Sequence, residues 1–185
     1  MQDGLSESKK LNLNLRIMFQ DEARFGRIND PKRCWCRAGV RPQVGKQIVR
    51  EYTYAYGAFA PKDGEAYFLI LPHMDSASMN IFLAELSAQY ATDYILLICD
   101  KAPSHSNGAL NIPYNIKIIY LPPYCPQLNP AENMWDEIRE KFFTNLVFDS
   151  LNAVIEKLTE AMIFYAKENH IVKSITNFNW INTHI

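Results

Sequence analysis

The chain has 185 residues, which is enough for one compact domain with an appendage and hardly for two. Hydrophobic residues make up 48% of it, and Gly (7) and Pro (10) are few, so disordered, collagenous and low-complexity classes are excluded. The 19 basic and 20 acidic residues give a net charge of −1, which by itself does not indicate a nucleic-acid partner.

The first half of the chain predicts strands that enclose an irregular segment. Residues 1–14 are polar and aperiodic, which we interpret as a loose leader or the stub of a linker. Residues 15–19 form a short apolar run that predicts a buried strand. Residues 52–59 and 66–71 are β-rich runs joined by a Pro-Lys-Asp-Gly turn, which predicts an antiparallel hairpin. Residues 24–50, with scattered Gly and Pro, predict an arm that leaves the core.

The predicted arm is strongly basic. Its stretch from position 32 to position 50 contains no acidic residue and six basic ones, which are Lys32, Arg33, Arg37, Arg41, Lys46 and Arg50. Such a run is either a solvated surface or a set of contacts to nucleic-acid phosphates, and the sequence leaves both open. Trp35 within it is either an anchor on a partner or the centre of a small local core.

The second half of the chain predicts a sheet covered by helices. An apolar stripe at helical spacing predicts an amphipathic helix at about 75–90. Residues 94–99 are continuously apolar, and the long crossover before them predicts parallel strand pairing. A further strand is predicted at 116–121, a helix with Asn129 as its N-cap follows, and a last helix begins at Ser150. This order of elements indicates an α/β fold, a mixed sheet flanked by helices.

Three carboxylates are candidates for chemistry. Asp21 and Asp100 follow the two most apolar strands, and catalytic groups of open α/β sheets gather at such strand ends. If the two strands are neighbours, these carboxylates lie ~5 Å apart, and hard oxygen ligands of this kind suit Mg²⁺ or Mn²⁺. Glu132, three residues after Asn129, is either a third ligand or the reciprocal partner in an N-capping box. Asp136, one helical turn further on, is the competing carboxylate.

Three blocks of sequence around these acids resemble the DDE transposases of the mariner-like insertion-sequence group. The blocks are Phe19–Gly26 (FQDEARFG), Asp100–His105 (DKAPSH) and Leu121–Trp135 (LPPYCPQLNPAENMW). The third block, a long Pro-rich lead into an acid-bearing helix, is the most specific, and the resemblance covers about residues 15–145. Lys101 departs from the family, which usually has Asn there. The resemblance implies a ribonuclease-H-like mixed sheet flanked by helices, with a basic arm inserted after the first strand.

The resemblance also implies roles for the site residues. Asp21 would bridge two Mg²⁺ (or Mn²⁺) ions, with Asp100 completing one coordination sphere and Glu132 the other. The ions would activate water and then a DNA 3′-hydroxyl for in-line attack on a phosphodiester, with no covalent enzyme intermediate. The residues expected beside these ligands are His105, Lys101 and Glu22. The six basic residues of the arm are expected to bind DNA.

We therefore interpret the chain as the catalytic domain of a cut-and-paste DNA transposase. Its expected partners are double-stranded DNA, at transposon ends and target, and a second copy of the chain engaged through a clamp-like arm. The family places helix-turn-helix domains ahead of the first acid, and only 20 residues precede Asp21, which predicts a separately encoded helix-turn-helix half. The rival interpretations are a catalytically inactive remnant that binds DNA or dimerises, and another ribonuclease-H-like nuclease.

The expected layout of the chain has three parts. A leader or linker stub occupies 1–14, the catalytic domain occupies 15–168 with its arm at 24–50, and a C-terminal tail occupies 169–185. No apolar run approaches the roughly 18 residues of a membrane helix. We therefore expect a soluble cytoplasmic protein with no membrane partner, associated with the nucleoid if its source is prokaryotic.

Overall fold

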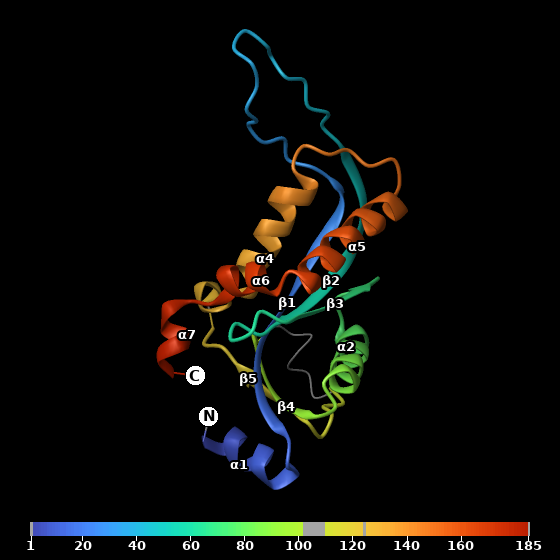
Figure 1. The fold of residues 1–185 in the computed structure, drawn as a ribbon. Helices are drawn as coiled ribbons and strands as arrows, with labels where there is room; N and C mark the ends of the chain where they lie inside the picture. Colours follow the sequence, from blue (N-terminus) through green and yellow to red (C-terminus); the bar gives the residue numbers. More distant parts are fainter. Residues whose placement is uncertain (1, 102–109, 124, 185) are drawn as a thin grey trace.

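The computed structural model describes residues 2–101, 110–123 and 125–184 as a mixed five-stranded sheet flanked by helices, as predicted (Figure 1). The strands are β1 (Asn14–Ile28), β2 (Ile48–Phe59), β3 (Ala66–Leu71), β4 (Asp93–Cys99) and β5 (Ile116–Tyr120), in the spatial order β3-β2-β1-β4-β5. The helices are α1 (Gln2–Leu11), α2 (Ser76–Gln89), α4 (Ala131–Ile138), α5 (Leu151–Lys167), α6 (Asn169–Thr176) and α7 (Asn179–His184). β1, β2 and β3 pair antiparallel, whereas β1, β4 and β5 pair parallel.

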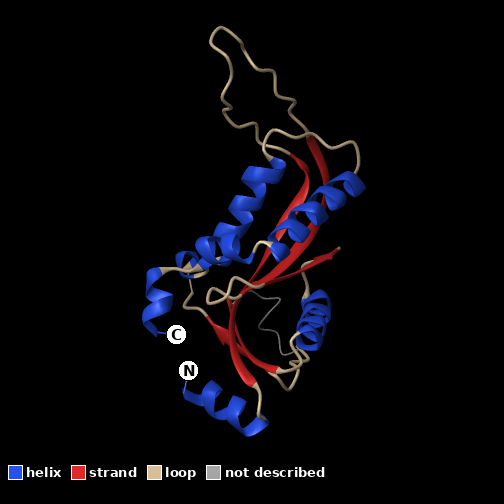
Figure 2. Ribbon diagram, viewed as in Figure 1, coloured by secondary structure: helices blue, strands red, loops and turns tan. Residues whose placement is uncertain are grey.

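Helices cover both faces of the sheet, because successive residues of a strand point to opposite sides (Figure 2). On one face, Met18 and Tyr56 of the sheet pack in a buried cluster with the apolar side of α2. On the other face, Phe25 and Phe59 pack with α4, α5 and α6. Each helix keeps a polar side, and within the described residues no helix is long and apolar enough to cross a membrane.

β1 extends well beyond the strand that the sequence predicts at 15–19, because its second half pairs with β2. Ala23 and Phe25 are buried there while Arg24 between them is exposed, which is the alternation of a half-buried strand. The predicted arm at 24–50 is therefore wrong at both ends. Its first and last residues belong to β1 and β2, and the irregular arm spans only residues 29–47 (Figure 1).

The hairpin of β2 and β3 is confirmed, and so is the parallel pairing of β4 with β1. Gly64 in the hairpin turn has a φ of +78°, in the region that favours glycine. A Cβ at this position would lie 1.9 Å from the backbone oxygen of Asn169, so only glycine lets the turn pack against the start of α6.

The predicted helices begin where their capping residues indicate. Asp75 accepts a hydrogen bond from the Ser78 N–H at 2.8 Å at the start of α2. Ser150 accepts one from the Ala153 N–H at 3.1 Å at the start of α5. The predicted strand at 116–121 is β5.

Two segments expected to be irregular are helical instead. The supposed loose leader at 1–14 contains α1, whose Gly4 packs so closely on β4 that a Cβ there would lie 2.7 Å from the Leu96 side chain. The supposed aperiodic tail at 169–185 contains α6 and α7, and it buries Val172 and Thr176 of α6. In α1 the small residues Gly4 and Ser8 face the core, whereas α6 packs the apolar residues Ile171, Val172 and Ile175 against it.

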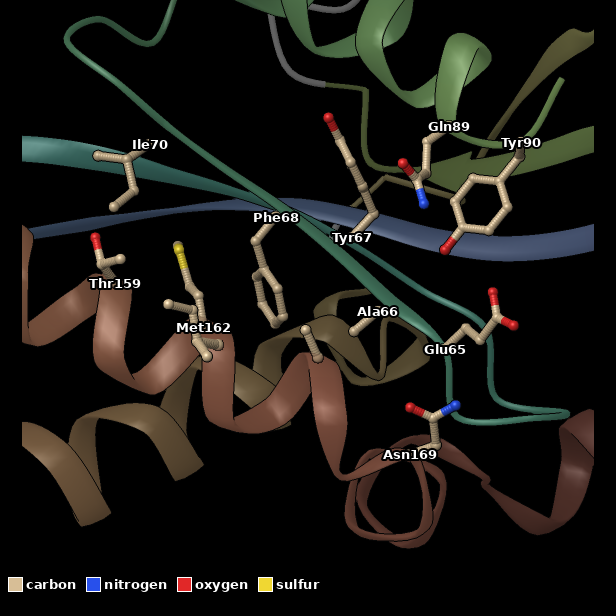
Figure 3. A pocket seen from close by; sticks show the side chains of 12 residues that line it. Glu65, Ala66, Tyr67, Phe68, Ile70, Gln89, Tyr90, Thr159, Met162 and Asn169 are labelled. Carbon is tan, nitrogen blue, oxygen red and sulfur yellow. The ribbon is translucent and has the colours of Figure 1, made fainter.

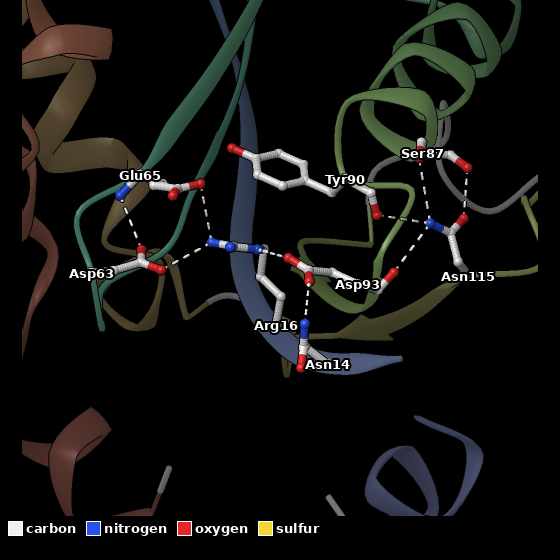
Figure 4. Close-up of polar contacts among 8 residues, drawn as sticks. All are labelled: Asn14, Arg16, Asp63, Glu65, Ser87, Tyr90, Asp93 and Asn115. Carbon is white, nitrogen blue, oxygen red and sulfur yellow. Dashed lines mark hydrogen bonds and ion pairs between the residues drawn. The ribbon is translucent and has the colours of Figure 1, made fainter. Parts of the chain in front are cut away.

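A polar network ties together the amino-terminal end of the parallel strands (Figure 4). The Arg16 guanidinium of β1 binds Asp93 at the start of β4, and also Asp63 at 3.0 Å and Glu65 at 3.2 Å in the β2–β3 hairpin. It lies over the Tyr90 ring, with 4.7 Å from Cζ to the ring centroid. Because Asp93 is buried, its charge depends on this partner.

We predict that Arg16→Ala destabilises the fold by about 3 kcal/mol, since it leaves the Asp93 carboxylate buried without its cation. Urea denaturation followed by circular dichroism measures the change. Lys10→Ala is the control, because Lys10 pairs with Glu7 at the surface of one helix, and it leaves the denaturation midpoint unchanged. Equal midpoints for Arg16→Ala and the unsubstituted chain would contradict a stabilising role.

Candidate active site

Asp21 lies at the point where β1 exchanges one neighbouring strand for another. On one side it pairs with Gly57 of β2. On the other side the parallel register with β4 ends at Phe19 opposite Ile98, an offset of 98 − 19 = 79. The same offset, 100 − 21 = 79, puts Asp21 level with Asp100, the residue after β4. The two acids therefore mark a common edge of the sheet, where ligand sites of α/β folds form.

Helix α4 is docked beside Asp21 by two polar contacts. The indole Nε1–H of Trp135 donates to Oδ2 of Asp21 at 3.0 Å. The Asn129 side chain donates from Nδ2 to the backbone oxygen of Gln20 at 3.0 Å and accepts from the Ala131 N–H at 3.2 Å. Asn129 therefore makes the hydrogen bond expected of an N-cap, although the helix proper begins at Ala131, after Pro130.

The environment of Asp21 strongly disfavours its charged form. Burial raises the pKa of Asp21 to about 8, and the negative charges of Glu132, Glu22 and Asp100 add to the effect, while a backbone hydrogen bond at Glu22 opposes it. A carboxyl group with other carboxylates around it ionises readily only if a cation is present.

The other predicted site residues differ in where they lie. Asp100 and Lys101 are exposed beyond the end of β4, and Glu132 is exposed in the first turn of α4. Glu22 lies on the opposite face of the sheet, because it is adjacent to Asp21 in a strand; there it opposes Tyr56, whose pKa is raised to about 12 by burial and then by Glu22. The charge of Glu22 nevertheless contributes to the raised pKa of Asp21, and its expected place beside the metal ligands stays a prediction. His105 lies outside the described residues.

The carboxylates are near one another without forming a closed cluster. Across residues 2–101, 110–123 and 125–184, no three His, Cys, Asp or Glu side chains are grouped tightly enough to hold one ion. The chemistry of the donors nevertheless suits a hard divalent cation, because Asp21, Asp100 and Glu132 offer only carboxylate oxygens. Neutralising their mutual repulsion is what such an ion would supply.

The alternatives for Glu132 and Asp136 are resolved by their contacts. In the described part of the chain, the Asn129 N–H donates no hydrogen bond to the Glu132 carboxylate, so the capping-box interpretation has no support. Asp136 is 81% exposed at its side chain and pairs with Arg139 at 3.4 Å. Glu132, in contrast, contributes to the raised pKa of Asp21. Glu132, unlike Asp136, is therefore among the charges that act on Asp21, and its role as a ligand stays a prediction.

Sequence reasoning missed the contact between Trp135 and Asp21. In the sequence Trp135 appears only as the last residue of the third block, and the structure buries its indole fully. The one signal that could have found the contact is Gly57, a glycine inside a β-rich run, which often marks a close approach of another group.

The arm presents its basic residues to solvent. All six predicted DNA-binding residues are exposed, five of them in the arm and Arg50 in β2. The side chain of Trp35 is fully exposed, so the interpretation that it centres a local core is wrong. Figure 2 shows the arm as an extended loop that projects from the end of β1 and β2.

The base of the arm is fastened to the connection between α4 and α5. The Lys32 N–H donates to Oδ1 of Asn145 at 2.8 Å, and Nδ2 of Asn145 donates back to the Lys32 carbonyl at 3.1 Å. The Gln47 side chain makes a similar reciprocal pair with the backbone of Phe148, at 2.9 and 3.2 Å. Asn29 also accepts from the Gln47 N–H at 2.7 Å, which joins the two sides of the base. Hydrogen bonds therefore fix the base of the arm to the core.

A groove elsewhere in the molecule contains none of the predicted site residues of the described part. It has a volume of about 690 Å³ and lies between β3, the end of α2 and α5 (Figure 3). Phe68 and Met162 line its floor, and Glu65 and Asn169 lie at one end. The candidate chemistry is at the strand ends and not in this groove.

The chain matches a known family and a relative from a bacterium. The family described as DDE superfamily endonuclease matches residues 16–155. The uncharacterized protein y4pE/y4sA of Sinorhizobium fredii (strain NBRC 101917 / NGR234) is 33% identical over 105 residues, which are 56% of this chain and 78% of that protein.

Solved structures share the fold. A pre-cleavage Mos1 transpososome has a TM-score of 0.63 at 19% identity, over 94% of this chain and 57% of the Mos1 chain. A Mos1 mariner paired end complex with Mn has a TM-score of 0.60 at 19% identity, over 94% and 57% of the two chains. The chain thus spans a little more than half the length of the Mos1 chains it matches. The predicted ribonuclease-H-like fold class is confirmed.

We predict that the titration of Asp21 makes the stability of the fold depend on pH. Without divalent cations, folded Asp21 keeps its proton up to about pH 8, while the unfolded chain loses it near the ordinary pKa of 3.8. The folded state therefore binds the extra proton between these values, so stability falls as pH rises, by at most about 1.4 kcal/mol per pH unit from this group.

Urea denaturation in a chelating buffer at pH 5, 6, 7 and 8 measures this slope. Asp21→Asn should flatten this slope, because the amide does not titrate. Asp136→Asn changes an exposed acid instead and should leave the slope unchanged. Parallel slopes for the unsubstituted chain and Asp21→Asn would show that Asp21 ionises normally in the folded state.

Proposed function

Because the chain belongs to the DDE superfamily endonuclease family, which matches residues 16–155, we propose that it is the catalytic domain of a cut-and-paste DNA transposase. Its reaction would be phosphodiester hydrolysis at transposon ends followed by transfer of the freed DNA strand. The observation that carries the proposal is the raised pKa of Asp21, which is buried near Glu132 and Asp100 at the carboxyl ends of parallel strands. Structural carboxylates are seldom grouped in this way, whereas cation-dependent phosphoryl-transfer sites need such a group.

Asp21, Asp100 and Glu132 would hold Mg²⁺ or Mn²⁺. When bound, the cation would supply an activated water or 3′-hydroxyl and stabilise charge on the phosphate. Support comes from the all-carboxylate donor set and from the Mos1 complexes of the same fold, which were solved with Mn and with Mg. Asp21 is held on a strand, Asp100 follows a strand end, and Glu132 lies in the first turn of a helix, so the donors come from separate elements.

The chain's other residues would bind and orient DNA. Lys101 is exposed next to Asp100 and can attract a phosphate. The six basic residues of the arm region would contact phosphates of double-stranded DNA at transposon ends and target, because they are exposed and carry no acidic residue among them. A general-base or phosphate-binding role for His105 stays a prediction.

We also propose a homodimer and a separately encoded helix-turn-helix half. The firmly mounted arm, with its exposed Trp35, would engage the second copy. Base-specific recognition of transposon ends needs an element that enters a groove of the DNA, and the helix-turn-helix half would provide it. A cytoplasmic location, with association to the nucleoid in a prokaryotic source, follows from this function.

The nicking of supercoiled plasmid in the presence of Mg²⁺ or Mn²⁺ tests the catalytic proposal. We expect slow nicking without sequence preference, lost on addition of chelator. Asp21→Asn, Asp100→Asn and Glu132→Gln should each lower the rate by roughly a hundredfold or more, the scale of losing a group that stabilises transition-state charge. Asp136→Asn, which changes an exposed acid of the same helix, is the matched control and should nick normally.

The rival interpretations give different results in the same assay. Absence of nicking with every metal would favour the inactive remnant. Preferential cleavage of RNA·DNA hybrids or branched DNA would favour another ribonuclease-H-like nuclease.

The salt dependence of DNA binding tests the arm. Arg37→Glu with Arg41→Glu should weaken binding to duplex DNA and reduce the slope of log affinity against log salt by ~0.9 for each lost phosphate contact. Lys167→Glu with Lys173→Glu makes the same change of charge on exposed residues of α5 and α6, and it should leave the slope unchanged. Identical slopes for the two double variants would mean that the arm is only a solvated surface.

A further inference from the structure

We propose that Trp135 is a positioning residue that fixes the orientation of the Asp21 carboxylate toward a bound cation, an inference that rests on the proposed metal site. The indole Nε1–H donates to Oδ2 of Asp21 at 3.0 Å. An indole has one donor and no acceptor, so it contributes nothing to a metal directly. It binds Oδ2, so Oδ1 is the oxygen of Asp21 that would bind a cation.

The indole is held rigidly enough for this role. It is fully buried and makes edge-on contacts with Phe25, Phe59 and Phe68, at ring-centroid distances of 6.3, 5.6 and 6.2 Å. These rings come from β1, β2 and β3, so three strands hold the indole in place. A donor that does not move restricts the carboxylate to one orientation.

Gly57 creates the space that lets the indole reach Asp21. Gly57 is the residue that pairs with Asp21 in β2. A Cβ at Gly57 would lie 2.7 Å from Cη2 of Trp135 and 2.7 Å from Cζ of Phe59, so any side chain would displace the indole. The strand next to Asp21 is thus shaped to accept Trp135, beyond what core packing alone requires.

Trp135 also links two of the proposed ligands. It follows Glu132 by three residues on α4, and residues at this spacing lie on neighbouring parts of a helix surface. The hydrogen bond from Trp135 to Asp21 therefore sets the position of the first turn of α4 relative to β1. Together with the hydrogen bond from Asn129 to Gln20, this contact holds the turn that carries Glu132 beside Asp21.

The inference is tested by the affinity of the full chain for Mn²⁺. Electron paramagnetic resonance measures this affinity, because it detects the Mn²⁺ that stays unbound. Trp135→Phe keeps an aromatic ring and removes the N–H donor, and Gly57→Ala keeps the donor and displaces it. Both should weaken Mn²⁺ binding by roughly tenfold or more, the usual effect of losing a group that orients a metal ligand. Both should also slow plasmid nicking at a fixed low metal concentration, and added Mn²⁺ should restore part of the rate.

Leu158→Ala is the control for loss of stability. Leu158 is fully buried in the same core cluster as Trp135, but its side chain has no hydrogen-bonding group. It should lower the denaturation midpoint and leave Mn²⁺ affinity unchanged. Affinity unchanged in Trp135→Phe but lost in Asp21→Asn would overturn the inference and leave the metal site standing. Affinity equal in Asp21→Asn and the unsubstituted chain would overturn both the metal site and the inference.

Discussion

Burial of the Asp21 carboxyl group near other carboxylates is the constraint on which the site depends. Its pKa is raised to about 8, first by burial and then by the charges of Glu132, Glu22 and Asp100. A fold that only had to be stable would avoid this arrangement, because keeping a carboxyl group protonated above its ordinary pKa of 3.8 costs stability. The docking of α4 by Asn129 and Trp135 keeps the arrangement in place. Stability has thus been lost locally at a position where a cation would restore it.

A polar network and the candidate acids lie at opposite ends of the parallel strands. At the amino-terminal end of the parallel strands, Arg16 joins β1, β4 and the hairpin through Asp93, Asp63 and Glu65. At the opposite end, Asp21 lies just past the part of β1 that pairs with β4, Asp100 follows β4, and the base of the arm is hydrogen-bonded to Asn145 in the α4–α5 connection. The base of the arm is therefore hydrogen-bonded to the segment that follows α4.

Local sequence patterns predict the elements whose signals are local. The apolar run at 94–99 and the Asp75 cap of α2 were sufficient to place a strand and a helix. The ends of the arm could not be predicted, because whether residues after Asp21 form a strand depends on a partner, β2, more than twenty residues away in the sequence. The helicity of α1 and α6 depends in the same way on surfaces that Gly4 and Thr176 meet only in the folded chain.

The three acids could be proposed from the sequence, but the contacts that surround them could not. Asp21, Asp100 and Glu132 follow from strand ends and a helix start, and the sequence blocks point to the same three residues. The opposite orientation of Glu22 would have followed from the two-residue period of a strand, had β1 been known to continue past Asp21. The contact of Trp135 with Asp21 requires the register that puts Gly57 opposite Asp21, which no local pattern contains.

The most direct measurement is a crystal structure of the chain soaked in Mn²⁺, with anomalous scattering recorded at the manganese edge. The account predicts an anomalous peak with carboxylate oxygens of Asp21, Asp100 and Glu132 at ~2.0 to 2.6 Å from it, and with the Trp135 indole still bonded to the other oxygen of Asp21. A peak bound by Asp136 in place of Glu132, or none near Asp21 at a saturating concentration, would contradict it.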